Sequence, residues 1–252
     1  MKTATLIIAI ASMAFAISGS LAMAQDRDHV IVGVGVAQIP AYQGADSYRT
    51  LPIPVIDIVS GPIYANLRDG VGVHVVSGNV LTIGGGLGLM PGYRRRDVPE
   101  GVDRLSFGVG GRLFARLNAG GIVATIGGTR GFAGGSKGAI VDASLSYPLI
   151  LSPRVQIFPS IGTSWSNARH NDRYFGIDAD ESTRSGLRRF DAGSGFKDVS
   201  AMLAANYRLT SRINLTVSGG LTSLLNEVKD SPLVIRRTQP MGFLSLSYRL
   251  GS

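Results

Sequence analysis

The chain contains no cysteine, one tryptophan and only three histidines among its 252 residues. Without cysteine there are no disulfides, no thiolate metal sites and no lipid-modified cysteine anchor. The histidines are too scattered for a metal site, so we expect neither a metal nor another cofactor. Acidic residues are also scarce, since 17 Asp and Glu stand against 25 Lys and Arg and leave a formal net charge of +8.

The amino-terminal segment is apolar but too short for a transmembrane helix, which needs about 20 residues. Lys2 precedes the apolar residues 6–17, and Ala22-Met23-Ala24 follows them as a small-x-small cleavage site. This pattern predicts a cleavable signal peptide over residues 1–24. Residues 25–252 would then form the mature domain.

Glycine is abundant, with 34 residues, many of them inside apolar stretches. Each would cost a helix roughly 1 kcal/mol relative to alanine, which disfavours helical folds. Residues 70–93 carry no charged side chain, but they hold eight glycines around a Ser77-Gly78-Asn79 turn. The segment is therefore predicted to be a β-hairpin rather than a membrane helix.

Apolar residues alternate with small or polar residues along most of the mature chain, as strands with one lipid-facing side require. Val30, Val32, Val34 and Val36 share one such face. Many runs reach the length of about 9–11 residues that a tilted transmembrane strand needs. About twelve strands are predicted, near residues 29–37, 52–59, 62–68, 70–76, 80–89, 104–117, 120–128, 138–149, 154–165, 197–209, 212–222 and 240–250.

The connections between these strands differ at the two ends. Short turns are expected at one end, whereas the long connections at the other end are residues 38–51, 90–103, 129–137, 166–196 and 223–239. This asymmetry is typical of outer-membrane barrels. The predicted fold is an all-β transmembrane antiparallel up-and-down β-barrel of about 12 strands, with short periplasmic turns and long extracellular loops.

Five segments of this sequence resemble the motifs of a known protein family. They are Pro40-Ala41-Tyr42-Gln43-Gly44-Ala45-Asp46, Leu51-Pro52-Ile53-Pro54, Tyr174-Phe175-Gly176-Ile177, Ser185-Gly186-Leu187-Arg188-Arg189-Phe190-Asp191-Ala192-Gly193 and Ser231-Pro232-Leu233. Together and in this order they resemble the MipA/OmpV family of proteobacterial outer-membrane proteins. The resemblance covers essentially the whole mature chain and implies the outer membrane of a Gram-negative bacterium.

The resemblance also implies a function, because the family is named for an interaction with a lytic murein transglycosylase. We therefore expect a non-enzymatic, monomeric scaffold that links the envelope to murein hydrolase and murein synthase. A narrow outer-membrane pore and a surface adhesin acting through the long loops remain alternatives. The loop with Tyr174, Phe175 and Leu187 is expected to fold inward and plug the lumen, with these side chains against the barrel wall.

A catalytic role is not expected. Only His170 lies in a long loop with nearby carboxylates and Ser182, and proximity in sequence is no catalytic geometry. We interpret it as a solvated loop histidine.

Basic residues gather in the long loops and on one lumen-facing strand. Arg94, Arg95, Arg96, Arg188 and Arg189 would face lipopolysaccharide, either docking on its phosphates or forming a solvated rim. Nucleic acid is not expected, because no stacking surface accompanies the charge. Inside the barrel, Arg112 and Arg116 should pair with Asp57 or Asp142 if the lumen is occluded.

Overall fold

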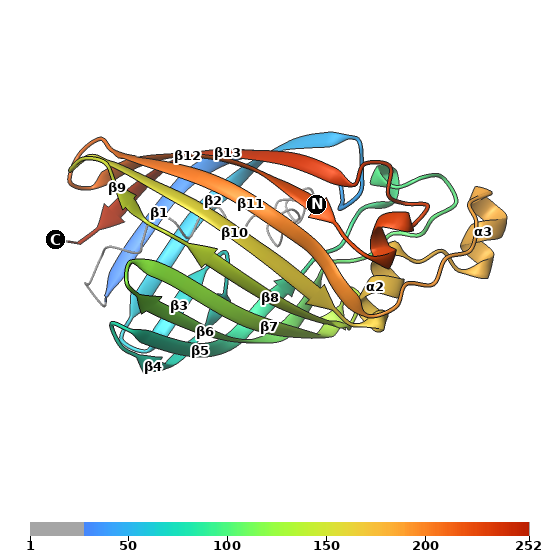
Figure 1. The fold of residues 1–252 in the computed structure, drawn as a ribbon, viewed down its shortest axis with the longest axis horizontal. Coiled ribbons are helices and arrows are strands. Elements are labelled where there is room, and N and C mark those ends of the chain that lie inside the picture. The colour runs from blue at the N-terminus through green and yellow to red at the C-terminus, as the bar shows by residue number, and fades with distance from the viewer. Residues whose placement is uncertain (1–27, 252) are drawn as a thin grey trace, which may run out of the picture.

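The computed structural model describes residues 28–251 and shows a closed barrel of antiparallel strands (Figure 1). Consecutive strands are neighbours in the wall, and β10 also pairs with β11, which closes the sheet on itself. The predicted signal peptide lies outside the described residues. The strands are β1 (His29–Pro40), β2 (Tyr48–Ser60), β3 (Ile63–Asn66), β4 (Gly70–Ser77), β5 (Leu81–Met90), β6 (Gly108–Ala119), β7 (Ile122–Gly134), β8 (Ala139–Ser146), β9 (Leu149–Ile150), β10 (Val155–Ser166), β11 (Gly195–Arg208), β12 (Ile213–Leu224) and β13 (Thr238–Leu250).

The thirteen strands occupy twelve positions in the wall. β8 and β9 both pair with β10, one after the other along its length, so they are two parts of one interrupted strand. Tyr147 and Pro148 separate them, and proline has no N–H to donate to the ladder. The prediction of an all-β barrel with about twelve strands is confirmed.

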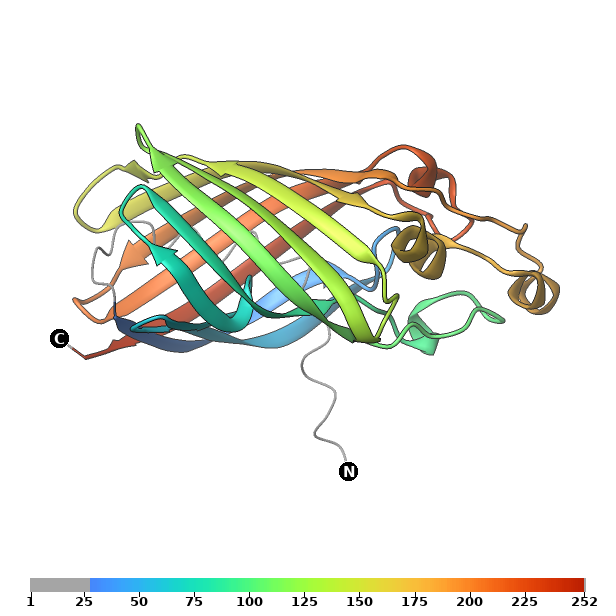
Figure 2. The ribbon, with the colours of Figure 1, turned by 90° about the horizontal axis from the view of Figure 1, so that it is seen from below.

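The two ends of the barrel differ as the connections predict. Short turns lie at the end that also holds the carboxyl terminus, and long connections with short helices extend beyond the opposite end (Figures 1 and 2). In outer-membrane barrels the short-turn end is periplasmic, and we call it the periplasmic rim. The helices of the long connections are η2 (Arg95–Asp97), α2 (Ala168–Phe175), α3 (Ala179–Ser185) and η3 (Glu227–Asp230).

The predicted long loop over residues 129–137 is wrong. β7 continues to Gly134 and β8 begins at Ala139, which leaves four connecting residues. Gly131 and Gly134 pair with Gly110 and Gly108 of β6. Gly131 and Gly134, which we predicted in a loop, are therefore residues of the barrel wall. Their pairing is possible because two glycine-rich strands can approach each other closely.

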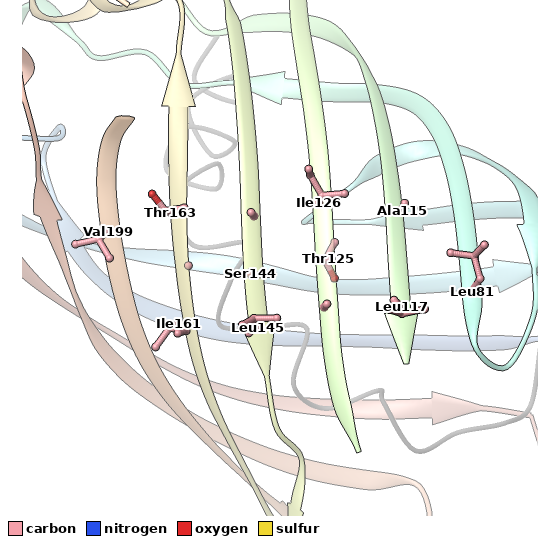
Figure 3. A pocket seen from close by; sticks show the side chains of 13 residues that line it. Leu81, Ala115, Leu117, Thr125, Ile126, Ser144, Leu145, Ile161, Thr163 and Val199 are labelled. Atoms are coloured by element: carbon pink, nitrogen blue, oxygen red, sulfur yellow. The ribbon is translucent and has the colours of Figure 1, made fainter. Parts of the chain in front are cut away.

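The outer face of the barrel is apolar. The mid-strand side chains of Leu113 and Leu203 are 72% and 53% exposed, as expected for groups that face lipid. Figure 3 shows part of this face, where Leu117, Ile126 and Leu145 stand on neighbouring strands around a shallow hollow. None of the helices within residues 28–251 is long and apolar enough to cross a bilayer.

Arginine at the lipid-facing position 203 should destabilise the barrel. Leu203→Arg places a guanidinium in hydrocarbon and should lower the free energy of unfolding by about 2–4 kcal/mol. Met202→Arg is the matched control, because Met202 is 7% exposed and lines a lumen cavity beside Asp142 and Asp198. Urea unfolding in liposomes measures both losses, and equal losses would contradict the assignment of the two faces.

Candidate functional surfaces

The long connections meet over the extracellular mouth of the barrel. Their apolar side chains form a buried cluster of their own, and we call these connections, residues 41–47, 91–107, 167–194 and 225–237, the mouth cap. The cluster includes Tyr42, Tyr93, Val102, Leu105, Tyr174, Phe175, Ile177, Val228 and Leu233. This apolar core comes mainly from four loops, with Leu224 at the end of β12 as a wall residue, and it buries apolar surface at the mouth.

Three of the family-like segments contact one another inside this cap. The Tyr42 hydroxyl donates to the Leu233 carbonyl at 2.9 Å, and the Ser231 hydroxyl donates to the Phe175 carbonyl at 2.5 Å. The Gln43 N–H donates to the Tyr174 hydroxyl at 3.1 Å. Segments almost 200 residues apart in sequence are therefore joined by direct hydrogen bonds.

Gly44 shows why one of these positions requires glycine. Its φ is +105°, and a Cβ there would lie 2.8 Å from a methyl group of Val234. Its N–H donates to the Gln239 side chain at 2.9 Å, and its carbonyl accepts from the N–H groups of Ile235 and Arg236. Any side chain would strain the backbone and separate these loops.

Tyr174 and Phe175 are buried, at 2% and 0% exposure, but they do not pack where we predicted. The Tyr174 ring lies against the rings of His170 and Tyr93 and against the adjacent Phe175 ring, and these residues belong to the cap or lie beside it rather than on the inner wall. Leu187 packs on the same cluster. The loop covers the mouth and does not insert into the lumen (Figure 1).

The remaining family-like residues terminate helices or turns. Gly176 follows α2 and donates its N–H to the Asp172 carbonyl at 2.8 Å. Ser185 ends α3, and Gly186 caps it with a φ of +72°. Pro232 is partly buried in the turn after Ser231. α3 lies at the outer extreme of the cap (Figure 1).

His170 is buried at 0% exposure, so its interpretation as a solvated loop histidine is wrong. Its Nδ1 lies 2.8 Å from the Ser136 hydroxyl, and its buried Nε2 has no hydrogen-bond partner. Burial, with a smaller contribution from Lys197, lowers the pKa of His170 to about 3. A Cβ at Gly138 would lie 2.5 Å from the His170 backbone, so this glycine allows α2 to pack on the β7–β8 turn.

The lumen below the cap holds a charged network that joins β6, β8 and the turn between β3 and β4. Arg112 donates to Asp142 at 2.7 Å and to Asp69 at 3.1 Å, and Arg116 donates to the other Asp69 oxygen at 3.1 Å. The predicted pairing of Arg112 with Asp142 is confirmed, whereas Asp57 lies 3.1 Å from His29 instead. Asp69 is the partner that sequence reasoning missed, because it lies in the turn between β3 and β4 and has no place in the alternating pattern of a strand.

Glycines in the wall create the space that this network occupies. A Cβ at Gly127 would lie 2.5 Å from the Arg112 guanidinium, and a Cβ at Gly84 would lie 2.7 Å from the Phe114 ring. One cavity of about 140 Å³ lies between Arg112 and the base of the cap. The space left by these inward glycines is therefore filled by the side chains of Arg112 and Phe114 and is not open.

The loop arginines face outward, but several already have partners. Arg95 lies 3.6 Å from Asp103, and Arg188 donates to the Asp230 carbonyl. Arg94 is partly buried, whereas Arg96 and Arg189 are exposed.

The periplasmic rim carries a second basic cluster, which we did not single out from the sequence. Arg208 donates its N–H to the Arg154 carbonyl at 2.8 Å, and Arg249 donates its N–H to the Arg212 carbonyl at 2.8 Å. Among the ion pairs of residues 28–251, none includes these four side chains. We call them the rim arginines; the signal in the sequence was an arginine at each of four consecutive strand ends.

Acid should loosen the mouth cap through His170. An opened cap would expose His170 with its ordinary pKa of 6.5, so the open state binds a proton that the closed state excludes. The free energy of opening the cap should therefore be highest above pH 6.5. It should decrease as the pH falls below this value, by about 2 kcal/mol at about pH 5. Hydrogen exchange of the α2 amides, corrected for intrinsic rates, measures this change. His170→Gln is the control, and an equal pH dependence in that variant would contradict the assignment.

Comparison with known proteins places the chain in a family. The family described as MltA-interacting protein MipA matches residues 32–250. The putative outer membrane protein YiaT of Escherichia coli K12 is 27% identical over 114 residues, which are 45% of this chain and 46% of that protein. An MltA-interacting protein of the same strain is 32% identical over 78 residues, 31% of each chain. The matching part thus spans less than half of each relative.

Solved structures give more distant similarities. The KdgM porin aligns with a TM-score of 0.45 and 10% identity, over 87% of this chain and 98% of that one. The CymD monoaromatic hydrocarbon channel aligns with a TM-score of 0.44 and 10% identity, over 95% and 92%. The family match covers nearly all described residues, and the relatives bear the names of outer-membrane proteins. This chain is therefore an outer-membrane β-barrel that belongs to the MipA family of MltA-interacting proteins.

Proposed function

We propose that this protein is a non-conducting scaffold, which holds a lytic murein transglycosylase, and through it murein synthase, at the periplasmic face of the outer membrane. The observation that carries the proposal is the obstruction of the barrel at two levels. The mouth cap has a buried apolar core, and the Arg112 network lies in the lumen beneath it, between β6, β8 and the turn that joins β3 and β4.

The Arg112 network supports a closed lumen because its charges compensate one another. Asp69 is 1% exposed and accepts from two guanidinium groups. Separating one partner would leave a buried charge unpaired, at a cost of about 3–5 kcal/mol. These side chains are therefore held in place inside the lumen, which favours a scaffold over a pore.

The rim arginines supply a docking surface on the side where murein lies. Individual turns at this rim are short, whereas a specific interface buries about 800 Å² on each partner. Arg154, Arg208, Arg212 and Arg249 come from neighbouring strand ends, so together they extend over several turns. A wide basic surface without internal acidic partners favours an acidic patch on the transglycosylase.

The exposed loop arginines serve a separate contact in this proposal. Arg96 and Arg189 face the outer leaflet side, where lipopolysaccharide phosphates are available. The protein acts as a monomer, with the cap outward and the rim arginines toward the cell wall.

Charge reversal at the rim should weaken capture of the transglycosylase. The double variant Arg208→Glu with Arg212→Glu should lower the association rate by about tenfold at low salt, because it replaces attraction with repulsion. The matched control reverses two exposed extracellular arginines, Arg189→Glu with Arg236→Glu. Surface plasmon resonance with purified transglycosylase measures both. A loss confined to the control would place the interaction on the extracellular side and contradict the proposal.

Purified protein in a planar bilayer should give no stable channels. Removing residues 171–192 would open the cap, yet the Arg112 network should still prevent a large conductance. Adding Arg112→Gln to this deletion should increase the conductance. Stable channels from the unaltered protein would contradict the scaffold and support a narrow pore, independently of the binding result.

A further inference from the structure

The loop between β12 and β13 carries a basic hollow. This loop, which includes η3, lies at the extracellular end of the two strands (Figure 1). The hollow is open and measures about 680 Å³, and the loop that follows α3 also contributes to it. We call it the basic hollow; its charged lining is Arg188, Lys229, Asp230, Arg236 and Arg237, and its apolar lining includes Ile235.

The charges that line the basic hollow do not compensate one another. Four cations stand against one carboxylate, which leaves an excess of three positive charges. The Asp230 carboxylate lies 3.0 Å from the Arg237 guanidinium, so this acid is already paired. Arg188 donates to the Asp230 carbonyl, which carries no formal charge. None of the ion pairs within residues 28–251 includes Arg188, Lys229 or Arg236. Three cations at this hollow are therefore left for an external anion.

The backbone beneath the hollow is fixed by the mouth cap. Val228 and Leu233 of the same loop belong to the buried apolar cluster of the cap. The N–H groups of Ile235 and Arg236 both donate to the Gly44 carbonyl, at 2.8 and 2.9 Å. The cations therefore project from an ordered frame, which reduces the conformational entropy that is lost when a ligand binds.

The basic hollow lies next to the lipid-facing surface of the barrel. Arg237 directly precedes β13, and its carbonyl accepts from the N–H of Leu224, the last residue of β12, at 2.9 Å. Further along these two strands, Leu221 and Leu244 are 51% and 45% exposed. Ile235, which lines the hollow, is 60% exposed. Basic side chains at the end of such an apolar face lie at the level of the lipid head groups.

We propose that the basic hollow binds a phosphate monoester on the sugar of an outer-leaflet glycolipid, the chemistry that a lipopolysaccharide head group offers. The proposal gives the lipopolysaccharide contact of the proposed function a defined site, and it does not depend on the transglycosylase. A phosphate monoester carries a charge of about −1.5 to −2 and three acceptor oxygens, so it suits three uncompensated cations better than a carboxylate does. Guanidinium groups bind phosphate with two parallel hydrogen bonds.

The size and the position of the hollow favour a glycolipid over a free anion. Its 680 Å³ equal the volume of about 20 water molecules, which is more than a phosphate group fills and leaves room for the sugar that carries it. The acyl chains of the same molecule continue along the outer face of β12 and β13. Such a ligand satisfies the cations of the hollow and the apolar wall beside it.

The test uses tryptophan fluorescence, because Trp165 is the only tryptophan in the chain. In a Trp165→Phe background, Ile235→Trp places a reporter at the hollow, and Leu203→Trp places a control reporter on the lipid-facing wall. The probe is lipid A with its phosphates, at increasing mole fraction in phosphatidylcholine vesicles that contain the protein. The signal at position 235 should saturate, whereas the signal at position 203 should only follow the lipid composition.

Charge recognition is tested with variants and with lipid A from which the phosphates have been removed. Lys229→Gln and Arg236→Gln should each weaken binding by about tenfold, as expected for the loss of one charge-assisted hydrogen bond. Arg104→Gln is the matched control, because Arg104 is an exposed arginine of the mouth cap that does not line the hollow. Lipid A without phosphates should give no saturating signal with the unaltered hollow.

Inorganic phosphate is the second probe, because it offers the same anion without the lipid. It should displace lipid A only in large excess, since it cannot bury apolar surface against the wall. A full signal from inorganic phosphate that lipid A does not increase would assign the hollow to a soluble anion and overturn the glycolipid.

Two further results would overturn the proposal. Equal binding of lipid A with and without its phosphates would show that the hollow does not recognise the anion. An equal loss of binding in Arg104→Gln and Arg236→Gln would show a general attraction to the basic cap rather than a site. Capture of the transglycosylase at the opposite rim is measured separately, so the failure of either proposal leaves the other standing.

Discussion

Hydrocarbon offers no water to hydrogen-bond with an exposed backbone N–H or carbonyl, and this constraint organises the whole molecule. It explains why β10 and β11 complete the ring and why β1 and β13 lie side by side. Within residues 28–251, residues 48–56 of β2 pair with β1 alone. Pro52 and Pro54 suit this stretch, because proline has no N–H to donate to a second ladder.

The charged network in the lumen is joined to the turn between β3 and β4. Asp69 accepts from Arg112 and Arg116, while the neighbouring Arg68 donates to Ser144 on β8 at 2.9 Å. These bonds hold the turn of the short β3–β4 hairpin inside the barrel. The same interaction therefore places charged side chains in the lumen and fixes this hairpin against β6 and β8.

The segments that identify the family act mainly on structure. Tyr42, Gly44, Tyr174, Phe175 and Ser231 join loops that are distant in sequence and form the core of the mouth cap. These residues come from three long loops, all on the extracellular side. The candidate surface for the murein enzyme lies at the opposite rim, where arginines from separate strand ends make up for short turns.

The sequence by itself determined the class of fold, because alternation with a period of two, strand length and the positions of turns are local properties. Strand number, the two different rims and the outward face of Leu203 follow from them. The sequence could not decide whether Gly131 and Gly134 lie in a loop or in a strand, because glycine is compatible with both. Their pairing with β6 decides for the strand. The pairing of Asp69 with Arg112 and the burial of His170 were decided only by tertiary structure. Each depends on which distant segments meet, and no local pattern records that.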